Sequence, residues 1–459
     1  MVSEFICTHL KDKRLYDPDF WIDRLHNPDE ILVDEYEIKS FNHLLYKKMV
    51  ESHLENYYYV FSDSKKEVTS DDFINEIEKI MSMEDLEKLM QENLFFKDSE
   101  KIKPLNKYQL KEFLSNFRDF KKGISADIPI SFGLITNRSG LKSIPFKYPL
   151  GITPNYPFHD ITRLTTLSPG EPILIYRRSF KLNWYFVQSS FYSGWINTKD
   201  LIEVSKKEFF DYNKSARTLI LIESKVCTEE VPTIGKFHFQ MGDKLVLASE
   251  EETNKFYLKM NTLFPEGCYP IKIPLKRRLV DEKYGIFPIS SAKEVKTSFL
   301  NFTQRNLIKQ AFKMVGERYG WGGSDYNRDC SRYIMDIFKC FGIYLPRDTK
   351  YQEIMTPAER TSFPQQTDKR KIILDGLKTG DLLFMKGHVM MYLGKFRNEY
   401  YVIHQGSGFK QKKANGDFES FDIHGTFIMP LSAYTLGTRT TYLDSLSSAV
   451  KITQGLNKI

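Results

Sequence analysis

The chain has 459 residues, of which 41 % are hydrophobic and 14 % aromatic, and its formal net charge is +7. This length exceeds one ordinary core and predicts two to four domains, and the aromatic content excludes a disordered protein. The charge bias is mild and its basic runs are short, so no nucleic-acid partner is expected. A weak attraction to an acidic polymer, such as a cell-wall polymer, is compatible with it.

The five cysteines are odd in number and irregularly spaced, so they predict no disulfide framework. No C-x-x-C pair occurs, and the sequence therefore predicts neither a structural zinc nor any other metal or cofactor. Cys340 lies inside an apolar helical pattern and is interpreted as a core thiol. Cys330 directly follows an aspartate and needs a separate explanation.

No apolar run approaches the roughly 18–20 residues of a membrane helix, so no integral membrane segment is expected. The first residues, MVSEFICTHLKDKRLYD, lack the long apolar centre of a signal peptide. Taken literally, this predicts a cytoplasmic protein. If an export signal is missing from this sequence, the protein would be periplasmic or secreted instead.

Residues 1–127 are predicted to form a helical N-terminal domain. The stretch SDDFINEIEKIMSMEDLEKLMQENLFF, residues 70–96, has apolar residues at helical spacing after a capped start at Ser70. The stretch NKYQLKEFLSNFRDFKKG, residues 106–123, repeats the pattern and ends in a glycine. Trp21 and the aromatic residues near it are interpreted as packing residues.

The next part of the chain has the pattern of small β-barrels. Short alternating or β-rich runs, such as PILIYRRSF, NWYFVQSS and DKLVLASE, stand between Gly, Pro and Asn turns. A polar segment at 206–215 divides these runs. We therefore predict a first barrel over residues 128–205 and a second over residues 206–292.

Residues 293–440 are predicted to form an α+β domain, which makes the whole chain α+β. Two helices are expected within TQRNLIKQAFKMVGERYG (303–320) and DCSRYIMDIFKCFGIYLP (329–346). Strands GDLLFM, HVMMYLG and EYYVIHQG follow, and the last two are expected to form a hairpin around 396–398. Residues 441–459 are predicted to be a C-terminal tail.

Cys330 is expected in the first turn of its helix, where Asp329 is the N-cap and the helix dipole favours a thiolate. His388 and His404 lie on predicted neighbouring strands, which can bring a base and its orienting group within reach of the sulfur. A core thiol, half of a disulfide and a Cys/His/His zinc site are the alternatives. The spacing lacks the local ligand pairs that are typical of zinc sites.

Four stretches in order, RYGWGGSDYNRDCS, FGIYLPRDTKYQ, GDLLFMKGHVMMYLG and VIHQGSG, together resemble the NlpC/P60 cysteine peptidases. The preceding layout resembles longer members of that family, which carry an N-terminal clip domain and two bacterial SH3-like barrels. The resemblance implies a papain-like catalytic domain over 293–440. Arg332 departs from the pattern, because a glycine, interpreted as a packing residue, usually follows D-C-S.

The resemblance also implies roles for individual residues. Cys330 is implied to be the nucleophile, His388 the base and His404 the residue that orients the base. Tyr319 is implied to help hold the oxyanion beside the Cys330 backbone N–H. The residues implied to bind the substrate's amino end are Asp329, Ser331 and Thr349. An ammonium there would also neutralise the Asp329 charge, which otherwise raises the pKa of the neighbouring thiol.

The first barrel is expected to read the end of the substrate, as in multi-domain relatives. Tyr192 and Trp195, in the turn FYSGWI, are the candidates for substrate contacts, with barrel packing as their alternative role. Asp160 is a candidate countercharge for the substrate's amine.

The implied function is hydrolysis of the γ-D-glutamyl–L-diamino acid bond of peptidoglycan stem peptides, through a thiolate and an acyl-enzyme. The diamino acid would be meso-diaminopimelate or Lys. The expected partners are stem peptides or muropeptides, with no obligate protein partner. Two alternatives stay open: a Cys–His amidase or acyltransferase on the same fold, and a cell-wall-binding module with a non-catalytic site.

Overall fold

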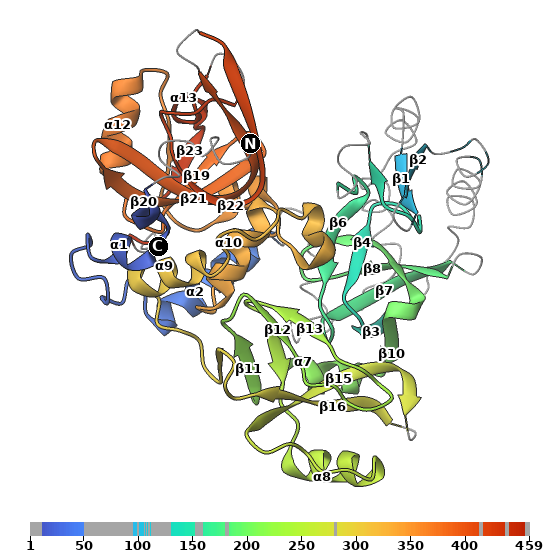
Figure 1. Cartoon of the computed structure of the whole chain (residues 1–459). Coiled ribbons are helices and arrows are strands. Elements are labelled where there is room, and N and C mark those ends of the chain that lie inside the picture. Colours follow the sequence, from blue (N-terminus) through green and yellow to red (C-terminus); the bar gives the residue numbers. More distant parts are fainter. Residues whose placement is uncertain are drawn as a thin grey trace.

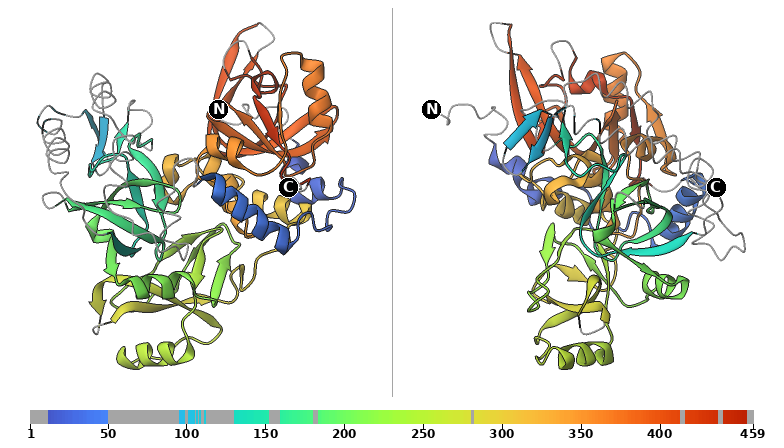
Figure 2. Two further views of the ribbon diagram at one scale, coloured as in Figure 1. Left: turned by 180° about the vertical axis from the view of Figure 1, so that it is seen from behind. Right: turned by 90° about the vertical axis from the view of Figure 1, so that its right-hand side faces the viewer.

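The chain forms a C-terminal α+β domain, two β-rich barrels beside it and an N-terminal helical segment that packs back onto the C-terminal domain (Figures 1 and 2). The structure is a computed structural model. It describes residues 12–49, 95–98, 101–104, 106, 108, 111, 130–151, 159–179, 183–279, 282–412, 416–436 and 440–454. The helices predicted over 70–96 and 106–123 lie almost entirely outside the described residues.

The N-terminal segment contains η1 (Lys13–Tyr16), α1 (Pro18–Ile22) and α2 (Glu35–Met49). Trp21 is 2 % exposed, and its ring centroid lies 5.4 Å from that of Tyr401 in the C-terminal domain. The Asn42 side-chain amide donates to the Gly342 carbonyl oxygen at 2.7 Å. The predicted packing role of Trp21 is therefore confirmed, and its partner Tyr401 lies more than 300 residues away in the sequence.

The first barrel is built on a seven-stranded antiparallel sheet in the order β10-β3-β7-β8-β9-β4-β6. The strands are β3 (Ser131–Ile135), β4 (Ser139–Lys142), β6 (Arg163–Leu167), β7 (Pro172–Ser179), β8 (Trp184–Gln188), β9 (Ser193–Asn197) and β10 (Leu201–Val204), with η4 (Thr198–Asp200) before β10. A separate three-stranded sheet joins β1 (Phe95–Asp98), β2 (Lys101–Pro104) and β5 (Leu150–Gly151). Strands β1 and β2 were not predicted.

The second barrel follows α7 (Lys206–Asn213) and contains three small antiparallel sheets around one apolar core. Its elements are β11 (Thr218–Leu221), β12 (Lys225–Cys227), β13 (His238–Gln240), β14 (Lys244–Val246), α8 (Glu250–Lys259), β15 (Cys268–Leu279), β16 (Glu282–Ser290) and β17 (Val295–Lys296). Neither α7 nor α8 was predicted. Each begins at a capping box, in which a serine and a glutamate three residues later bond each other's backbone N–H.

The C-terminal domain has a six-stranded antiparallel sheet in the order β18-β23-β19-β20-β21-β22. Its strands are β18 (Arg360–Ser362), β19 (Leu382–Met385), β20 (His388–Phe396), β21 (Glu399–Lys412), β22 (Phe418–Pro430) and β23 (Ser448–Val450). Its helices are α9 (Gln304–Phe312), η5 (Trp321–Tyr326), α10 (Cys330–Lys339), α11 (Thr349–Met355), α12 (Thr367–Asp375) and α13 (Tyr442–Ser445).

Helices cover both faces of this sheet, and the strand residues alternate between them. Val389 and Met391 pack in the core that contains α9 and α10, whereas Met390 packs in the core that contains α12 and α13. The predicted hairpin of β20 and β21 is confirmed. Its turn residues Arg397 and Asn398 both have positive φ, 49° and 64°, as the tightest hairpin turns require.

Residues 441–454 are not the predicted tail. They form α13 and β23, and β23 lies between β18 and β19 inside the six-stranded sheet. Thr453 secures this segment by donating its backbone N–H and its hydroxyl to Asp381 Oδ1, at 3.0 and 2.7 Å. The apolar pattern of residues 448–450 is too short to predict a strand, because this strand pairs only with segments that are distant in the sequence. The boundaries drawn after residues 127, 205 and 292 stay predictions.

Replacing Trp21 by alanine tests whether the N-terminal segment stabilises the C-terminal domain. The substitution removes a buried indole from that core, so we expect the free energy of unfolding to fall by about 3–5 kcal/mol. Denaturant unfolding followed by circular dichroism measures it. Tyr36→Ala, at a side chain 79 % exposed on α2, is the control and should change the same quantity by less than about 0.5 kcal/mol. Equal stability of the two variants would contradict the assigned packing role.

Candidate active site

Cys330 is the first residue of α10, and the helix begins there because Asp329 caps it. The Arg332 backbone N–H donates to Asp329 Oδ1 at 2.9 Å. The apolar side of α10, including Ile334 and Ile337, is buried against the sheet. This packing fixes the position of the sulfur, and Cys330 is 6 % exposed.

His388 and His404 meet on the neighbouring antiparallel strands β20 and β21, as predicted. Nε2 of His388 lies 2.7 Å from Nδ1 of His404, and the two rings are nearly perpendicular, at 78°. Since Nε2 of His388 faces His404, Nδ1 is the nitrogen that remains to take a proton. Gly406 is required here, because a Cβ at this position would lie 2.8 Å from Cε1 of His404.

The sulfur of Cys330 lies at the start of β20. The Val389 backbone N–H is near enough to the sulfur to lower its pKa, and Thr349 Oγ1 lies 3.6 Å from the sulfur. Val389 directly follows His388, so the sulfur is placed beside the histidine pair. Thr349 is the first residue of α11, which follows the L-P-R-D segment.

Tyr319 brings a second hydrogen-bond donor to the same point. The Cys330 backbone N–H is near enough to the Tyr319 hydroxyl to lower the pKa of the phenol. Burial raises the pKa of the Tyr319 phenol far above its usual value, with contributions from Cys330 and Asp329, so the hydroxyl keeps its proton. An oxyanion between these groups would find two donors.

Asp329, which was predicted to bind the substrate's amine, already makes several hydrogen bonds within the protein. Its carboxylate accepts from five donors, which use the roughly four lone-pair directions that a carboxylate offers. These donors are Arg347 Nη1 at 2.9 Å, Arg347 Nη2 at 2.5 Å, Gly322 N at 3.0 Å, Arg332 N at 2.9 Å and Ser331 Oγ at 3.2 Å. Arg347 therefore supplies a countercharge to Asp329, and the contact of Asp329 with a substrate amine stays a prediction.

The three barrel residues that were predicted to contact substrate have different surroundings in the structure. Tyr192 donates its hydroxyl to Asp348, which joins the first barrel to the segment before Thr349. Trp195 is 2 % exposed and packs on Phe186 in the barrel core, so its predicted substrate contact is replaced by packing. Asp160 is buried in an ion pair with Lys142, at 3.1 Å, and is thus already neutralised.

A cleft of about 1330 Å³ opens at this site, and Tyr319 and His388 lie in its wall. The first barrel contributes His159, whose ring stacks on Trp321 of η5 at 4.2 Å. The cleft also carries charges of both signs from Arg318, Lys386, Asp325 and Asp422. Sequence reasoning assigned no role to Trp321 or Arg347, although both lie within the quoted motifs, and nothing in the sequence placed His159 here.

Burial controls the ionisation of the reacting groups. Loss of hydration, with a smaller contribution from Asp329, raises the pKa of the Cys330 thiol to about 11. Loss of hydration lowers the pKa of His388 to about 4, and burial also holds that of His404 well below its usual value. Burial therefore opposes the thiolate predicted from the helix N-terminus, and it favours the neutral forms of both Cys330 and His388.

No group of three or more His, Cys, Asp or Glu side chains among the described residues is arranged to hold a metal ion. Within the same residues, every helix is too short or too polar to span a bilayer.

The comparisons with known proteins agree with this geometry. Residues 316–421 match the NlpC/P60 family, and residues 146–197 match the SH3 domain of the SH3b1 type. The chain carries an NlpC/P60 domain. The predicted resemblance to these cysteine peptidases is therefore confirmed, as is the α+β fold class with an SH3-like barrel ahead of the NlpC/P60 domain.

Two curated relatives match parts of the chain. Dipeptidyl-peptidase 6 of Lysinibacillus sphaericus is 31 % identical over 93 residues, which are 20 % of this chain and 30 % of that protein. The gamma-D-glutamyl-L-lysine dipeptidyl-peptidase of Bacillus subtilis (strain 168) is 29 % identical over 147 residues, 30 % of this chain and 38 % of that protein. The matches thus span about a third of the length of these relatives.

A solved structure of an NlpC/P60 endopeptidase from Photobacterium damselae subsp. piscicida matches nearly the whole chain. The TM-score is 0.69 at 18 % identity, over 95 % of this chain and 97 % of that one. At this identity the match shows a shared fold, including the domains ahead of the NlpC/P60 domain.

The raised pKa of Cys330 predicts its reactivity toward iodoacetamide. Since the thiolate is the reacting form, the alkylation rate at Cys330 should rise about tenfold per pH unit from pH 7 to above pH 9. Peptide-level mass spectrometry separates this site from Cys227 and Cys268, which are partly exposed. A rate that levels off below pH 8 would show that the helix N-terminus, and not burial, controls the thiol.

Proposed function

We propose that the chain is a cysteine endopeptidase that hydrolyses the γ-D-glutamyl–L-diamino acid bond of peptidoglycan stem peptides. The observation that carries the proposal is the His388–His404 pair on β20 and β21, with the Cys330 sulfur near the adjoining residue Val389 and with Tyr319 and His388 in the wall of one cleft. The γ-D-glutamyl bond is supported by the name of the B. subtilis relative, which describes that protein.

In the proposed mechanism, the Cys330 thiol transfers its proton to Nδ1 of His388 while the sulfur attacks the substrate carbonyl. The neutral pair suits this step, because neither group must lose a charge before it reacts. As His388 becomes charged, its Nε2–H donates to Nδ1 of His404, which stabilises the imidazolium.

The oxyanion that forms on the carbonyl accepts from the Cys330 N–H and from the Tyr319 hydroxyl. His388 then gives its proton to the departing amine, and water cleaves the acyl-enzyme. Asp329, Ser331 and Thr349 remain the candidates for the substrate's amino end, because the first two flank Cys330 and Thr349 Oγ1 lies 3.6 Å from the sulfur. Tyr192 remains a candidate contact for the end of the substrate.

The deciding experiment is mass spectrometry of L-Ala-γ-D-Glu-diaminopimelate and of its Lys counterpart after incubation with wild type and Cys330→Ala. An amine-acetylated tripeptide and an intact muropeptide complete the set. We expect release of L-Ala-D-Glu by wild type alone. Loss of cleavage on acetylation would show that the free amine is read.

Three results would overturn the proposal. Cleavage by Cys330→Ala would remove Cys330 as the nucleophile. Release of a different amide group, or transfer of the acyl group to an added amine, would indicate an amidase or acyltransferase. A folded protein with a titratable Cys330 that cuts none of these substrates would indicate a cell-wall-binding module.

Tyr319→Phe tests the second oxyanion donor. Losing one such donor costs about 2.7–4 kcal/mol of transition-state stabilisation, so kcat should fall about 10²–10³-fold with KM nearly unchanged. Tyr400→Phe is the control, because that hydroxyl bonds Asp375 near the opposite face of the sheet. A Tyr319→Phe enzyme with wild-type kcat would assign the oxyanion to other donors.

A further inference from the structure

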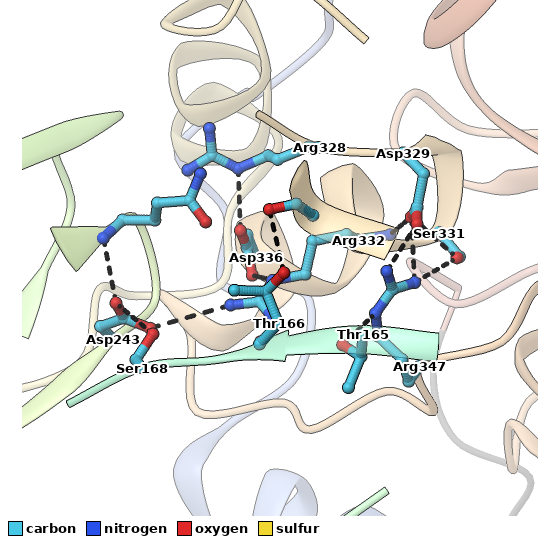
Figure 3. Close-up of polar contacts among 12 residues, drawn as sticks. Thr165, Thr166, Ser168, Asp243, Arg328, Asp329, Ser331, Arg332, Asp336 and Arg347 are labelled. Carbon is cyan, nitrogen blue, oxygen red and sulfur yellow. Dashed lines mark hydrogen bonds and ion pairs between the residues drawn. The ribbon is translucent and has the colours of Figure 1, made fainter. Parts of the chain in front are cut away.

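Strand β6 of the first barrel runs between two parts of the candidate active site. Figure 3 shows Thr165 and Thr166 of this strand facing the side chains of Arg347 and Arg332, which come from the NlpC/P60 domain. Both threonines are 3 % exposed. Their polar groups therefore form hydrogen bonds within the protein and not with solvent.

Thr165 holds the arginine that neutralises Asp329. Its Oγ1 accepts from Arg347 Nε at 2.9 Å, while the two terminal nitrogens of Arg347 donate to Asp329. A guanidinium has five N–H donors in a fixed plane, so a bond at Nε sets the direction of the other two nitrogens. Thr165 thus fixes the plane in which Arg347 meets the carboxylate beside Cys330.

Thr166 holds the loop that forms one wall of the cleft. Its hydroxyl lies 2.8 Å from the Gly322 carbonyl oxygen and 3.0 Å from that of Gly323. The Thr166 carbonyl oxygen accepts from Arg332 Nη1 at 3.2 Å, and Arg332 in turn bonds Asp336 on α10. One residue of the barrel therefore joins the cleft wall to the helix that carries Cys330.

The backbone of this loop is shaped against β6. Gly322 and Gly323 have φ of 58° and 80°, and a Cβ on Gly322 would lie 2.9 Å from the Arg163 carbonyl oxygen. Asp325 and Tyr326 in the same loop also have positive φ, which is strained for residues other than glycine. Such a conformation persists where surrounding contacts determine it, and β6 supplies contacts of that kind.

We propose that β6 is a positioning element of the NlpC/P60 active site: Thr165 orients Arg347 against Asp329, and Thr166 fixes the loop Trp321–Tyr326. The first barrel then contributes to catalysis through its placement of these groups, in addition to any contact with substrate. The proposal rests on the proposed function only in taking Cys330 as the reactive thiol.

Thr165→Val and Thr165→Ser test the first half in the full-length protein. Valine keeps the shape and loses the hydroxyl, whereas serine keeps the hydroxyl. Because the charge of Arg347 favours the Cys330 thiolate, misplacing it should slow iodoacetamide labelling of Cys330 about 3–10-fold at pH 9. We expect this loss in Thr165→Val and near wild-type labelling in Thr165→Ser.

Thr166→Val and Thr166→Ser test the second half by hydrogen–deuterium exchange. The valine variant should exchange faster over residues 320–327, and the serine variant should match wild type. Thr253→Val, in the second barrel, removes a hydroxyl that donates to the Ser249 carbonyl oxygen far from the cleft, and should change neither readout. Thermal unfolding of every variant identifies general destabilisation.

Equal effects of valine and serine would assign the threonines to packing and overturn the proposal, as would wild-type behaviour of both valine variants. These readouts need no substrate. If they shift as expected while wild type cleaves no stem peptide, the positioning role stands and the proposed function fails. If wild type cleaves stem peptides and the valine variants behave as wild type, the reverse holds.

Discussion

The arrangement of this site depends on neutralising one buried carboxylate. Asp329 starts α10 as its N-cap and therefore lies beside the Cys330 sulfur, where its charge opposes a thiolate. Arg347 lies close enough to offset that charge through two hydrogen bonds, and Arg347 is itself held by Thr165. This neutralisation thus requires three parts of the chain together: the cap of α10, the segment before α11 that carries Arg347, and the barrel strand β6 that carries Thr165. The site would be incomplete with the NlpC/P60 domain alone.

A second set of buried charges connects the domains behind the site. Arg328 and Arg332 each donate to Asp336, at 2.8 and 2.7 Å, and Asp336 is fully buried (Figure 3). Arg328 also bonds the Ser224 carbonyl oxygen of the second barrel, and Arg332 reaches the first. Buried ion pairs contribute little net stability, because desolvation offsets their attraction, but removing one partner leaves a costly unpaired charge. Such a network favours one arrangement of the domains over others. In the NlpC/P60 pattern a glycine, interpreted as a packing residue, usually stands at the position of Arg332. In this chain, Arg332 is a residue on which the arrangement of the domains depends.

The sequence predicted the parts of the site that are determined locally. Because Asp329 stands before an apolar helical pattern, Cys330 was predicted to lie in the first turn of a helix. The alternation of side chains along neighbouring strands predicted that His388 and His404 lie close together. The resemblance to the NlpC/P60 peptidases predicted the role of Tyr319. The sequence also contains the Ser205–Glu208 and Ser249–Glu252 capping signals, so the starts of α7 and α8 are determined locally as well. What could not be predicted depends on pairing between distant segments. Nothing local to β23 indicates its place between β18 and β19, and Thr165 and Thr166 have no pattern that distinguishes them from other barrel residues. Trp195 shows a second reason why a role could not be predicted. An aromatic residue in a turn has the same sequence pattern whether it binds a ligand or fills a core.

The ionisation of Cys330 shows why position in the sequence is not sufficient to assign chemistry. A helix N-terminus lowers a thiol pKa, whereas burial raises it, and the burial of Cys330 becomes apparent only in the three-dimensional packing. The same burial lowers the pKa of His388 and favours its neutral form. In the proposed mechanism, charge would develop on the oxyanion and on the imidazolium together, next to Tyr319 and His404 respectively. In that mechanism these contacts would stabilise charge separation in the transition state more than in the resting site, which is the condition for them to accelerate the reaction.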